Sequence, residues 1–215
     1  MYKLIIFDLD GTLINSIYDL ADAINTSLEE LKYPTHPLEK FYYFVGNGAL
    51  KLCERALPAD HRTDEEIKRL SEMFNQRYHK NCVSKTKPYE GICELLNKLK
   101  EKGVKLAVAS NKPDRFSKYI VESIFGTQVF DCVFGKRDSC PTKPDPRIVN
   151  DILEQMNIDR QQAIFAGDSD VDVMTAHNAE LKCIGCVWGF RGEDELKKAG
   201  ADLLAYKPSD FLEII

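Results

Sequence analysis

Residues 3–12 of the chain read KLIIFDLDGT, and this stretch decides the fold. Its apolar run is short and ends in a glycine turn, which is typical of a strand buried on both faces of a parallel sheet. Side chains two positions apart on an extended chain share a face, so Asp8 and Asp10 should point into one site, about 6.5–7 Å apart along the strand. Two anions that close repel unless a cation or a shared proton offsets them. Taken alone, the pair also fits a strand that simply ends in polar turn residues.

Short apolar runs recur along the chain, and amphipathic segments separate most of them. The expected strands are 3–8, 104–109, 131–134, 163–167, 181–187 and 202–205. Helical spacing of apolar residues follows Pro88, Asn111 and Pro146, and Asn111 is a favoured N-cap residue for the second of these helices. Alternation of strands and helices predicts an α/β fold built on a doubly wound parallel sheet.

The segment 15–85 breaks this alternation, because it contains helical patterns but no convincing strand. Ser16-x-x-Asp19 resembles a capping box ahead of the first amphipathic run. A purely helical block between the first and second strands is most simply a small second domain. The expected division is therefore residues 1–14 and 86–215 for an α/β core and residues 15–85 for an all-helical cap.

The composition is that of an ordinary globular protein: of 215 residues, 44% are hydrophobic and 29% are charged. The formal charge is −5, and the sequence contains no block of basic residues that would form a positively charged surface for nucleic acid or an anionic membrane. No apolar run approaches the roughly 18 residues of a membrane-spanning helix, and Met1 leads into the first strand without room for a secretory signal. We expect a cytoplasmic protein that is a monomer or a homodimer.

Cys183-Ile-Gly-Cys186 resembles a redox motif or half of a zinc site. The motif lies in an expected strand, however, where an offset of three residues sends the two thiols to opposite faces. No second pair of Cys or His residues completes a four-ligand zinc site. We therefore expect structural thiols.

Polar residues follow four of the expected strands, at the carboxyl edge where an open parallel sheet binds its ligands. They are Asp8, Asp10, Gly11 and Thr12 after the first strand, Ser110 and Asn111 after the second, Lys143 past the third, and Asp168 and Asp172 after the fourth. Each group by itself also fits a helix cap, a surface lysine or a capped helix start. Their convergence on one point favours a functional site.

The chemistry that needs such a set is phosphoryl transfer. Three carboxylates, those of Asp8, Asp10 and Asp168, suit Mg²⁺, which takes a few protein oxygens and keeps several waters. A lysine, a hydroxyl and the N–H groups of a glycine turn would spread the charge of the phosphoryl group. A carboxylate can act as nucleophile and form an aspartyl-phosphate, which divides one difficult displacement into two.

In this order the motifs resemble the four signature motifs of the haloacid dehalogenase superfamily. They are DLDGTL at residues 8–13, SNK at 110–112, KP at 143–144 and GDSxxD at 167–172. The helical insert is similar to the small helical cap of that superfamily. The resemblance implies a Rossmann-like core, a Mg²⁺ cofactor and a small-molecule phosphate ester as substrate.

By position, the resemblance also implies a role for each core residue. Asp8 would be the nucleophile, and Asp10 would be the general acid and base whose main-chain carbonyl also touches the metal. The phosphoryl group would be held by Gly11, Thr12, Ser110, Asn111 and Lys143. The metal would be bound by Asp8, Asp10 and Asp168, with Asp172 as a residue that orients these groups.

Within the cap, the segment Val45-Gly46-Asn47-Gly48 is similar to bacterial phosphoglycolate phosphatases. The two glycines expose backbone N–H groups at a helix start, which suits an anion such as a carboxylate. A hinge between cap helices is the alternative interpretation. The similarity implies 2-phosphoglycolate as the first candidate substrate. The implied substrate contacts are Gly46, Asn47, Gly48 and Arg55.

Other functions on the same core stay open: a phosphosugar mutase of the β-phosphoglucomutase type, a pyrophosphatase or a nucleotidase. A mutase needs a cap that holds a second phosphate, and the sequence shows no clear basic pair for it beyond Lys51 and Arg55. A non-catalytic binding protein would be expected to have lost a motif residue, and none is lost. One departure from the family pattern is Glu180, which replaces the usual glycine after the helix of the fourth motif and puts the end of that helix in doubt.

Overall fold

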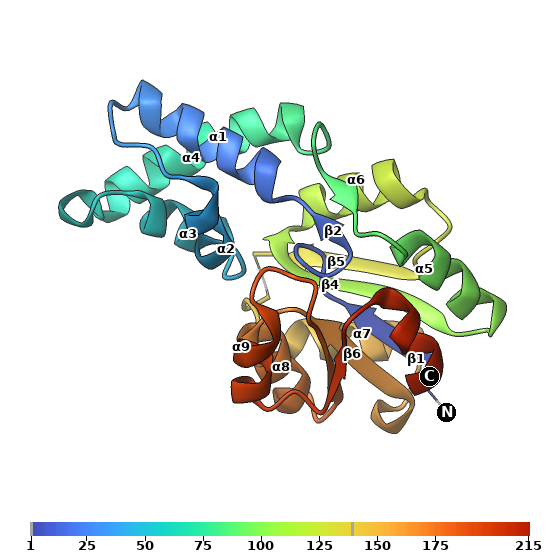
Figure 1. Ribbon diagram of the computed structural model, residues 1–215. Coiled ribbons are helices and arrows are strands. Elements are labelled where there is room, and N and C mark those ends of the chain that lie inside the picture. The colour runs from blue at the N-terminus through green and yellow to red at the C-terminus, as the bar shows by residue number, and fades with distance from the viewer. Residues whose placement is uncertain (1, 139) are drawn as a thin grey trace.

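The computed structural model describes residues 2–138 and 140–215, and it places a parallel sheet beneath a cap of helices (Figure 1). The six strands are β1 (Leu4–Phe7), β4 (Lys105–Pro113), β5 (Cys132–Lys136), β6 (Ala163–Gly167), β7 (Lys182–Cys186) and β8 (Leu203–Ala205). All six expected strands are confirmed. Only β4 differs clearly from its expected bounds, because it runs on to Pro113.

β1 lies in the middle of the sheet, whose order is β5-β4-β1-β6-β7-β8 with every pairing parallel. From β1 the chain winds first to one edge of the sheet and then to the other. This order makes β1 the topological switch point, where open α/β sheets bind ligands. Phe7 pairs with both Val108 and Ala166, so Asp8 emerges at the carboxyl edge between two neighbouring strands.

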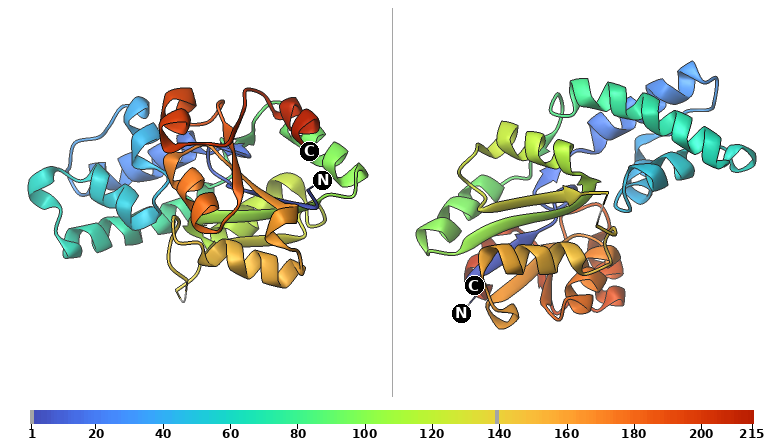
Figure 2. Two further views of the ribbon diagram at one scale, coloured as in Figure 1. Left: turned by 90° about the horizontal axis from the view of Figure 1, so that it is seen from below. Right: turned by 180° about the vertical axis from the view of Figure 1, so that it is seen from behind.

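The side chains of β1 alternate between two apolar layers, because helices cover both faces of the sheet (Figure 2). Ile5 and Phe7 belong to one layer, and Leu4 and Ile6 belong to the other. The first layer includes residues of α5 (Ile92–Glu101), α6 (Asp114–Phe125) and α10 (Phe211–Ile214); the second includes residues of α7 (Arg147–Met156), α8 (Asp170–Asn178) and α9 (Gly192–Ala199). Burial on both sides explains why the run contains no polar residue.

The thiols of β7 follow the same alternation. Cys186 belongs to the layer of Ile5, and Cys183 belongs to the layer of Ile6. Both are buried, and burial raises the pKa of each thiol. The expectation of structural thiols on opposite faces is confirmed.

The cap is inserted between β1 and β4 and consists of helices only. Its elements are α1 (Ile17–Glu30), α2 (Leu38–Phe44), α3 (Ala49–Ala56), a 3₁₀ turn (Ala59–His61) and α4 (Asp64–Asn81). A short antiparallel pair, β2 (Ile14–Asn15) with β3 (Lys87–Pro88), joins the two crossings between cap and core. Two-residue strands are too short to give a recognisable alternation, so the sequence did not predict this pair.

The expected capping box at the start of α1 is wrong, since both of its side chains make tertiary contacts instead. Ser16 makes no side-chain cap, and its hydroxyl donates a hydrogen bond to Asp10. The carboxylate of Asp19 accepts the backbone N–H groups of Lys85 and Thr86. The bonds of Asp19 tie α1 to the segment that returns to the core, and the bond of Ser16 ties its start to the turn after β1.

Glu180 takes the backbone conformation that glycine usually provides after the helix. Its φ is +59°, in the left-handed region, directly after the C-cap residue Ala179 of α8. This conformation costs a non-glycine residue about 1–2 kcal/mol. The helix therefore ends normally, with a small backbone strain.

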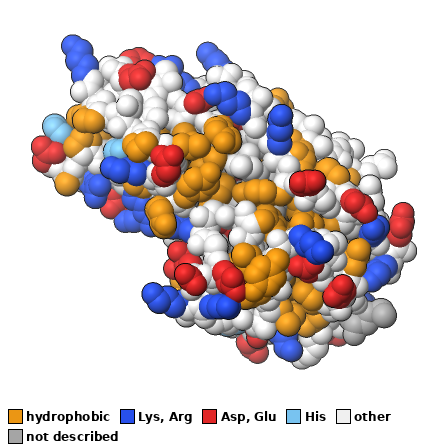
Figure 3. Space-filling model, viewed as in Figure 1, with side chains coloured by type: hydrophobic (Ala, Val, Ile, Leu, Met, Phe, Trp, Pro, Cys, Tyr) orange, Lys and Arg blue, Asp and Glu red, His pale blue; other side chains and the backbone are white. Residues whose placement is uncertain are grey.

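Acidic and basic side chains are interspersed over the face shown in Figure 3, and hydrophobic ones gather over its middle, between the cap helices and the core. Charges of one sign therefore do not dominate this face. Within residues 2–138 and 140–215, every helix is too short or too polar to cross a membrane.

Candidate active site

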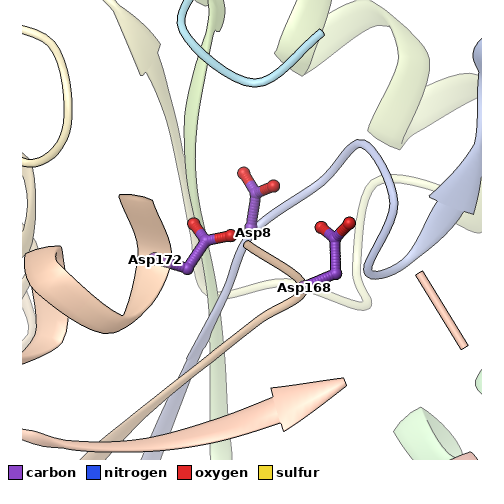
Figure 4. Close-up of side chains that lie close together, drawn as sticks. All are labelled: Asp8, Asp168 and Asp172. Atoms are coloured by element: carbon purple, nitrogen blue, oxygen red, sulfur yellow. The ribbon is translucent and has the colours of Figure 1, made fainter. Parts of the chain in front are cut away.

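Three carboxylates meet at the carboxyl edge of the sheet (Figure 4). Asp8 follows β1, Asp168 follows β6, and Asp172 lies in the first turn of α8. One oxygen of each carboxylate lies within 4.8 Å of the others, and all three residues are buried. In the described part of the chain, this is the only such group of acidic, His or Cys side chains.

Asp168 lies in a cradle formed by two glycines. Its carboxylate accepts the Thr12 hydroxyl at 3.2 Å and the Phe190 backbone N–H at 2.8 Å. A Cβ atom on Gly11 would lie 2.3 Å from this carboxylate, and one on Gly189 would lie 2.2 Å from the Asp168 side chain. The close approach requires glycine at both positions. Thr12, predicted to hold the phosphoryl group, here holds Asp168.

Lys143 joins two of the three carboxylates. Its Nζ lies 2.7 Å from an oxygen of Asp8 and 2.7 Å from an oxygen of Asp172. The second oxygen of Asp172 accepts the backbone N–H and the hydroxyl of Ser169. Asp172 is thus occupied in holding the lysine, which supports its implied role of orienting the other groups.

The cluster holds more negative than positive charge in a buried place. Burial raises the pKa of Asp8 to about 7 in spite of the Lys143 ammonium. Burial, together with the like charges of Asp172 and Asp8, raises the pKa of Asp168. A divalent cation would favour the ionised carboxylates, and a set of oxygen donors without His or Cys suits Mg²⁺.

Asp10 points its carboxylate away from this cluster and toward the cap. One oxygen accepts the Ser16 hydroxyl, and the other lies 3.1 Å from Lys112 Nζ. The strand ends at Phe7, so the turn that follows sets the direction of Asp10, not the strand pleat assumed from the sequence. The three carboxylates that meet are consequently those of Asp8, Asp168 and Asp172, and the Asp10 carboxylate that was expected beside the metal is not among them.

Asn111 lies within β4 and does not begin a helix, so the expected N-cap is wrong; α6 begins at Asp114. The Asn111 amide accepts the backbone N–H of Lys143 at 2.7 Å and donates to the Gly46 carbonyl at 3.0 Å. It therefore ties the core strand both to the lysine of the site and to the cap loop. Neighbouring Ser110 lies in the wall of the pocket described next.

A pocket of about 50 Å³ lies between core and cap, over Asp8 and Asp10. The core side carries the polar groups, which include Ser110 and Lys112. The side chains on the cap side are apolar apart from the hydroxyl of Tyr78. They belong to Leu20, Val45, Ala49, Leu52, Phe74 and Tyr78.

The cap residues predicted to contact substrate separate into two groups. Gly46 and Gly48 line the pocket, whereas Asn47 and Arg55 do not. The guanidinium of Arg55 donates to two carbonyls at the C-terminal end of α2 and thereby stabilises the cap itself.

Three contacts of the site were not foreseen from the sequence. Lys112 Nζ donates to the Tyr78 hydroxyl of α4 at 2.8 Å, and Arg191 donates to the Val45 carbonyl of the cap at 3.0 Å. The third is the Phe190 N–H that binds Asp168. Lys112 could have been found, because it stands inside the SNK motif. Nothing in the sequence marks Tyr78 as a residue of the site, because it lies on the apolar face of its helix.

Comparison with known proteins gives a consistent result. Residues 5–186 match the family model of haloacid dehalogenase-like hydrolases. The chain is 38% identical to a phosphoglycolate phosphatase of Psychrobacter arcticus, over 89% of this chain and 86% of the relative. It is 33% identical to a phosphoglycolate phosphatase of Haemophilus influenzae, over 94% and 92%. The crystal structure of a protein from Lactobacillus delbrueckii matches with a TM-score of 0.94 at 31% identity, covering 100% of this chain and 98% of that one.

Proposed function

The chain belongs to the haloacid dehalogenase-like hydrolases, and we propose that it is a Mg²⁺-dependent phosphatase for a small phosphate monoester such as 2-phosphoglycolate. One observation carries the proposal. Asp8 is bound by Lys143 and lies close to two further carboxylates, directly beneath a pocket whose other acid, Asp10, faces the cap. The names of the relatives support the choice of substrate.

Asp8 is the proposed nucleophile. Lys143 holds one of its oxygens at 2.7 Å, and within the described residues the second oxygen accepts no hydrogen bond. That oxygen attacks phosphorus, the ester P–O bond breaks, and the products are an aspartyl-phosphate and the leaving alkoxide. Lys143 and the hydroxyl of Ser110 would bind the phosphoryl oxygens during this transfer.

Asp10 serves as acid and then as base in this scheme. In the first step it gives a proton to the leaving oxygen, and in the second it takes a proton from the water that attacks phosphorus. The second step breaks the bond between Asp8 and phosphorus and releases phosphate. Ser16 and Lys112 hold the Asp10 carboxylate toward the pocket, where these transfers occur.

Asp8 and Asp168 are the side chains that would hold Mg²⁺, together with the main-chain carbonyl of Asp10. A bound Mg²⁺ would stabilise negative charge on the phosphoryl oxygens and favour the ionised form of Asp8. Asp172 would keep Lys143 in place beside this cluster.

The cap favours hydrolysis of a small ester over transfer to a sugar phosphate. A cavity of 50 Å³ has room for about three to five water-sized groups. A mutase would need basic residues that hold a second phosphate. Lys51 instead pairs with Glu54 at 2.7 Å, and Arg55 is bound to carbonyls of its own domain; neither residue lines the pocket.

The test is an assay of the purified protein against 2-phosphoglycolate, glucose phosphates, pyrophosphate and nucleotides, with Mg²⁺ or with chelator. Asp8→Asn, which keeps the size of the side chain, is the matched control. We expect Mg²⁺-dependent release of phosphate from the smallest ester and no appreciable turnover by the variant. Retained turnover by Asp8→Asn, isomerisation of a sugar phosphate in place of phosphate release, or inactivity toward all these compounds would contradict the proposal.

A further inference from the structure

One buried ammonium of the pocket holds no phosphoryl oxygen in the scheme above. Lys112 lies on β4 and is 7% exposed. Its Nζ donates to the Tyr78 hydroxyl at 2.8 Å and lies 3.1 Å from an oxygen of Asp10. An ammonium has three N–H donors. Within the described residues, the third donor of Lys112 has no acceptor at hydrogen-bond distance.

The surroundings of this ammonium strengthen its attraction for an anion. Phe74, Phe116 and Pro113 line the same pocket, and the charge of an ammonium acts more strongly beside such apolar groups than in water. Burial raises the pKa of Tyr78, so its hydroxyl stays neutral and adds no charge of its own. Among the described residues, Lys112 is the only basic side chain that lines the pocket.

Asp10 determines how far the leaving group lies from this ammonium. An acid that protonates the ester oxygen must lie within about 2.6–3.2 Å of it, so the ester oxygen lies within about 6 Å of Lys112 Nζ. The oxygens of a carboxylate on the carbon attached to that ester oxygen lie three bonds further and can close this gap. A neutral group of the same size would reach the same place but would bring no charge.

We propose that Lys112 recognises the leaving group by binding the carboxylate on the carbon that bears the ester oxygen. The inference rests on the proposed phosphatase function and assigns the residue that distinguishes this substrate from a neutral ester of the same size. The carboxylate contact thereby moves from the cap, where the sequence placed it, to core strand β4. Tyr78 acts through Lys112 as a positioning residue, because its hydroxyl and its ring, whose centroid lies 4.6 Å from Nζ, hold the ammonium in place.

The test compares two esters that differ in one group: 2-phosphoglycolate, which carries a carboxylate, and 2-hydroxyethyl phosphate, which carries a neutral hydroxymethyl. Wild type and Lys112→Met are assayed on both, because methionine keeps much of the stem and removes the charge. The ratio of kcat/KM for 2-phosphoglycolate to that for the neutral ester should fall by about 30- to 100-fold in the variant, as expected for one lost charge-assisted contact. An equal loss on both esters would overturn the proposal, since Lys112 would then serve Asp10 alone.

A binding measurement separates failure of this inference from failure of the proposed function. Calorimetry measures the affinity of 2-phosphoglycolate for Asp8→Asn and for the double variant Asp8→Asn/Lys112→Met. A Kd at least about tenfold weaker in the double variant supports recognition by Lys112 even where the wild type turns over neither ester. An unchanged Kd contradicts it.

Tyr78→Phe provides a second variant in case Lys112→Met does not fold. It removes the hydroxyl and keeps the ring. We expect KM for 2-phosphoglycolate to rise about 3- to 10-fold, while KM for 2-hydroxyethyl phosphate changes less. Equal changes in KM for the two esters would contradict the positioning role.

Discussion

The two walls of the pocket differ in what they contribute. The core wall presents two carboxylates, a hydroxyl and an ammonium, those of Asp8, Asp10, Ser110 and Lys112. The cap wall presents apolar side chains, the backbone of a glycine loop and one hydroxyl, that of Tyr78. In the proposed mechanism the strand ends of the core therefore carry out the reaction, whereas the cap limits the size of the substrate and restricts water.

After loss of the nucleophile, the largest loss of activity is expected when the acid of the core wall is removed. Asp10→Asn should lower kcat for 2-phosphoglycolate by about 10²–10⁴-fold, the usual contribution of general acid–base catalysis. With acetyl phosphate, whose leaving group needs no proton, the variant should still form the phosphoenzyme and release acetate in a burst. Rapid-quench kinetics measures both quantities. Equal losses in burst rate and in turnover would contradict the assigned role.

Removal of the core lysine should damage stability, whereas removal of a cap lysine should not. Lys143→Met leaves the buried carboxylates of Asp8 and Asp172 without their cation, which should cost about 3–5 kcal/mol of unfolding free energy at pH 8. The loss should be smaller at pH 5, where a carboxyl can be protonated and neutral. Lys51→Met in the cap removes an exposed pair and should leave stability nearly unchanged. Urea denaturation of both variants measures the difference, and similar losses would contradict it.

Stability in the absence of metal should depend on pH through the core. Because the pKa of Asp8 is raised to about 7, its contribution to stability is most favourable below pH 4 and is lost as the pH rises through about 7; the raised pKa of Asp168 acts in the same direction. Mg²⁺ at the proposed site would bind the ionised forms, so at one hundred times its Kd it should add about 2.7 kcal/mol at pH 8, or about 5–10 °C in Tm, and much less at pH 5. Calorimetric scans measure the shift. Equal shifts at both pH values, or a normal shift in Asp168→Asn, would count against this metal site.

The smallest expected effect concerns the cap wall. Phe74→Leu enlarges the pocket and leaves every charged group in place. It should change kcat for 2-phosphoglycolate only slightly and raise the relative kcat/KM for an ester with one more carbon by about tenfold. Steady-state kinetics on the two esters measures this ratio. A large loss of kcat with unchanged selectivity would mean that the cap contributes to the chemistry itself.

The core was predictable from the sequence because its signals are local. A short apolar run determines a buried strand, and the polar residues directly after it reach the carboxyl edge wherever the strand lies in the sheet. The places of Asp8 and Asp168 follow from this rule, whereas Lys143 lies seven residues past the end of β5 and its backbone is held in place by Asn111. Asp10 did not follow it, because the chain turns after Phe7 and the alternation of the strand stops there.

The cap was predictable as helices but not as a wall of the site. Ser16 and Asp19 have the spacing of a capping box, yet tertiary partners on the core side bind them more favourably than the end of the helix does. Tyr78 follows the helical spacing of core residues, so only the packed structure shows that its hydroxyl meets Lys112. Arg55 carries the positive charge expected of a residue that contacts an anionic substrate, but its guanidinium instead donates to nearby backbone carbonyls of the cap.

In the proposed mechanism Asp8 forms a bond to phosphorus, and this bond can be detected directly. Protein incubated with Mg²⁺ and 2-phosphoglycolate is quenched in acid within the turnover time, digested, and mapped by mass spectrometry. We expect one phosphoryl group on the peptide that contains Asp8, absent from Asp8→Asn, and accumulating further in Asp10→Asn when acetyl phosphate, whose leaving group needs no proton, replaces 2-phosphoglycolate. A phosphoryl group on any other residue, or release of acetate by Asp10→Asn with no phosphorylated peptide at any time point, would contradict this mechanism.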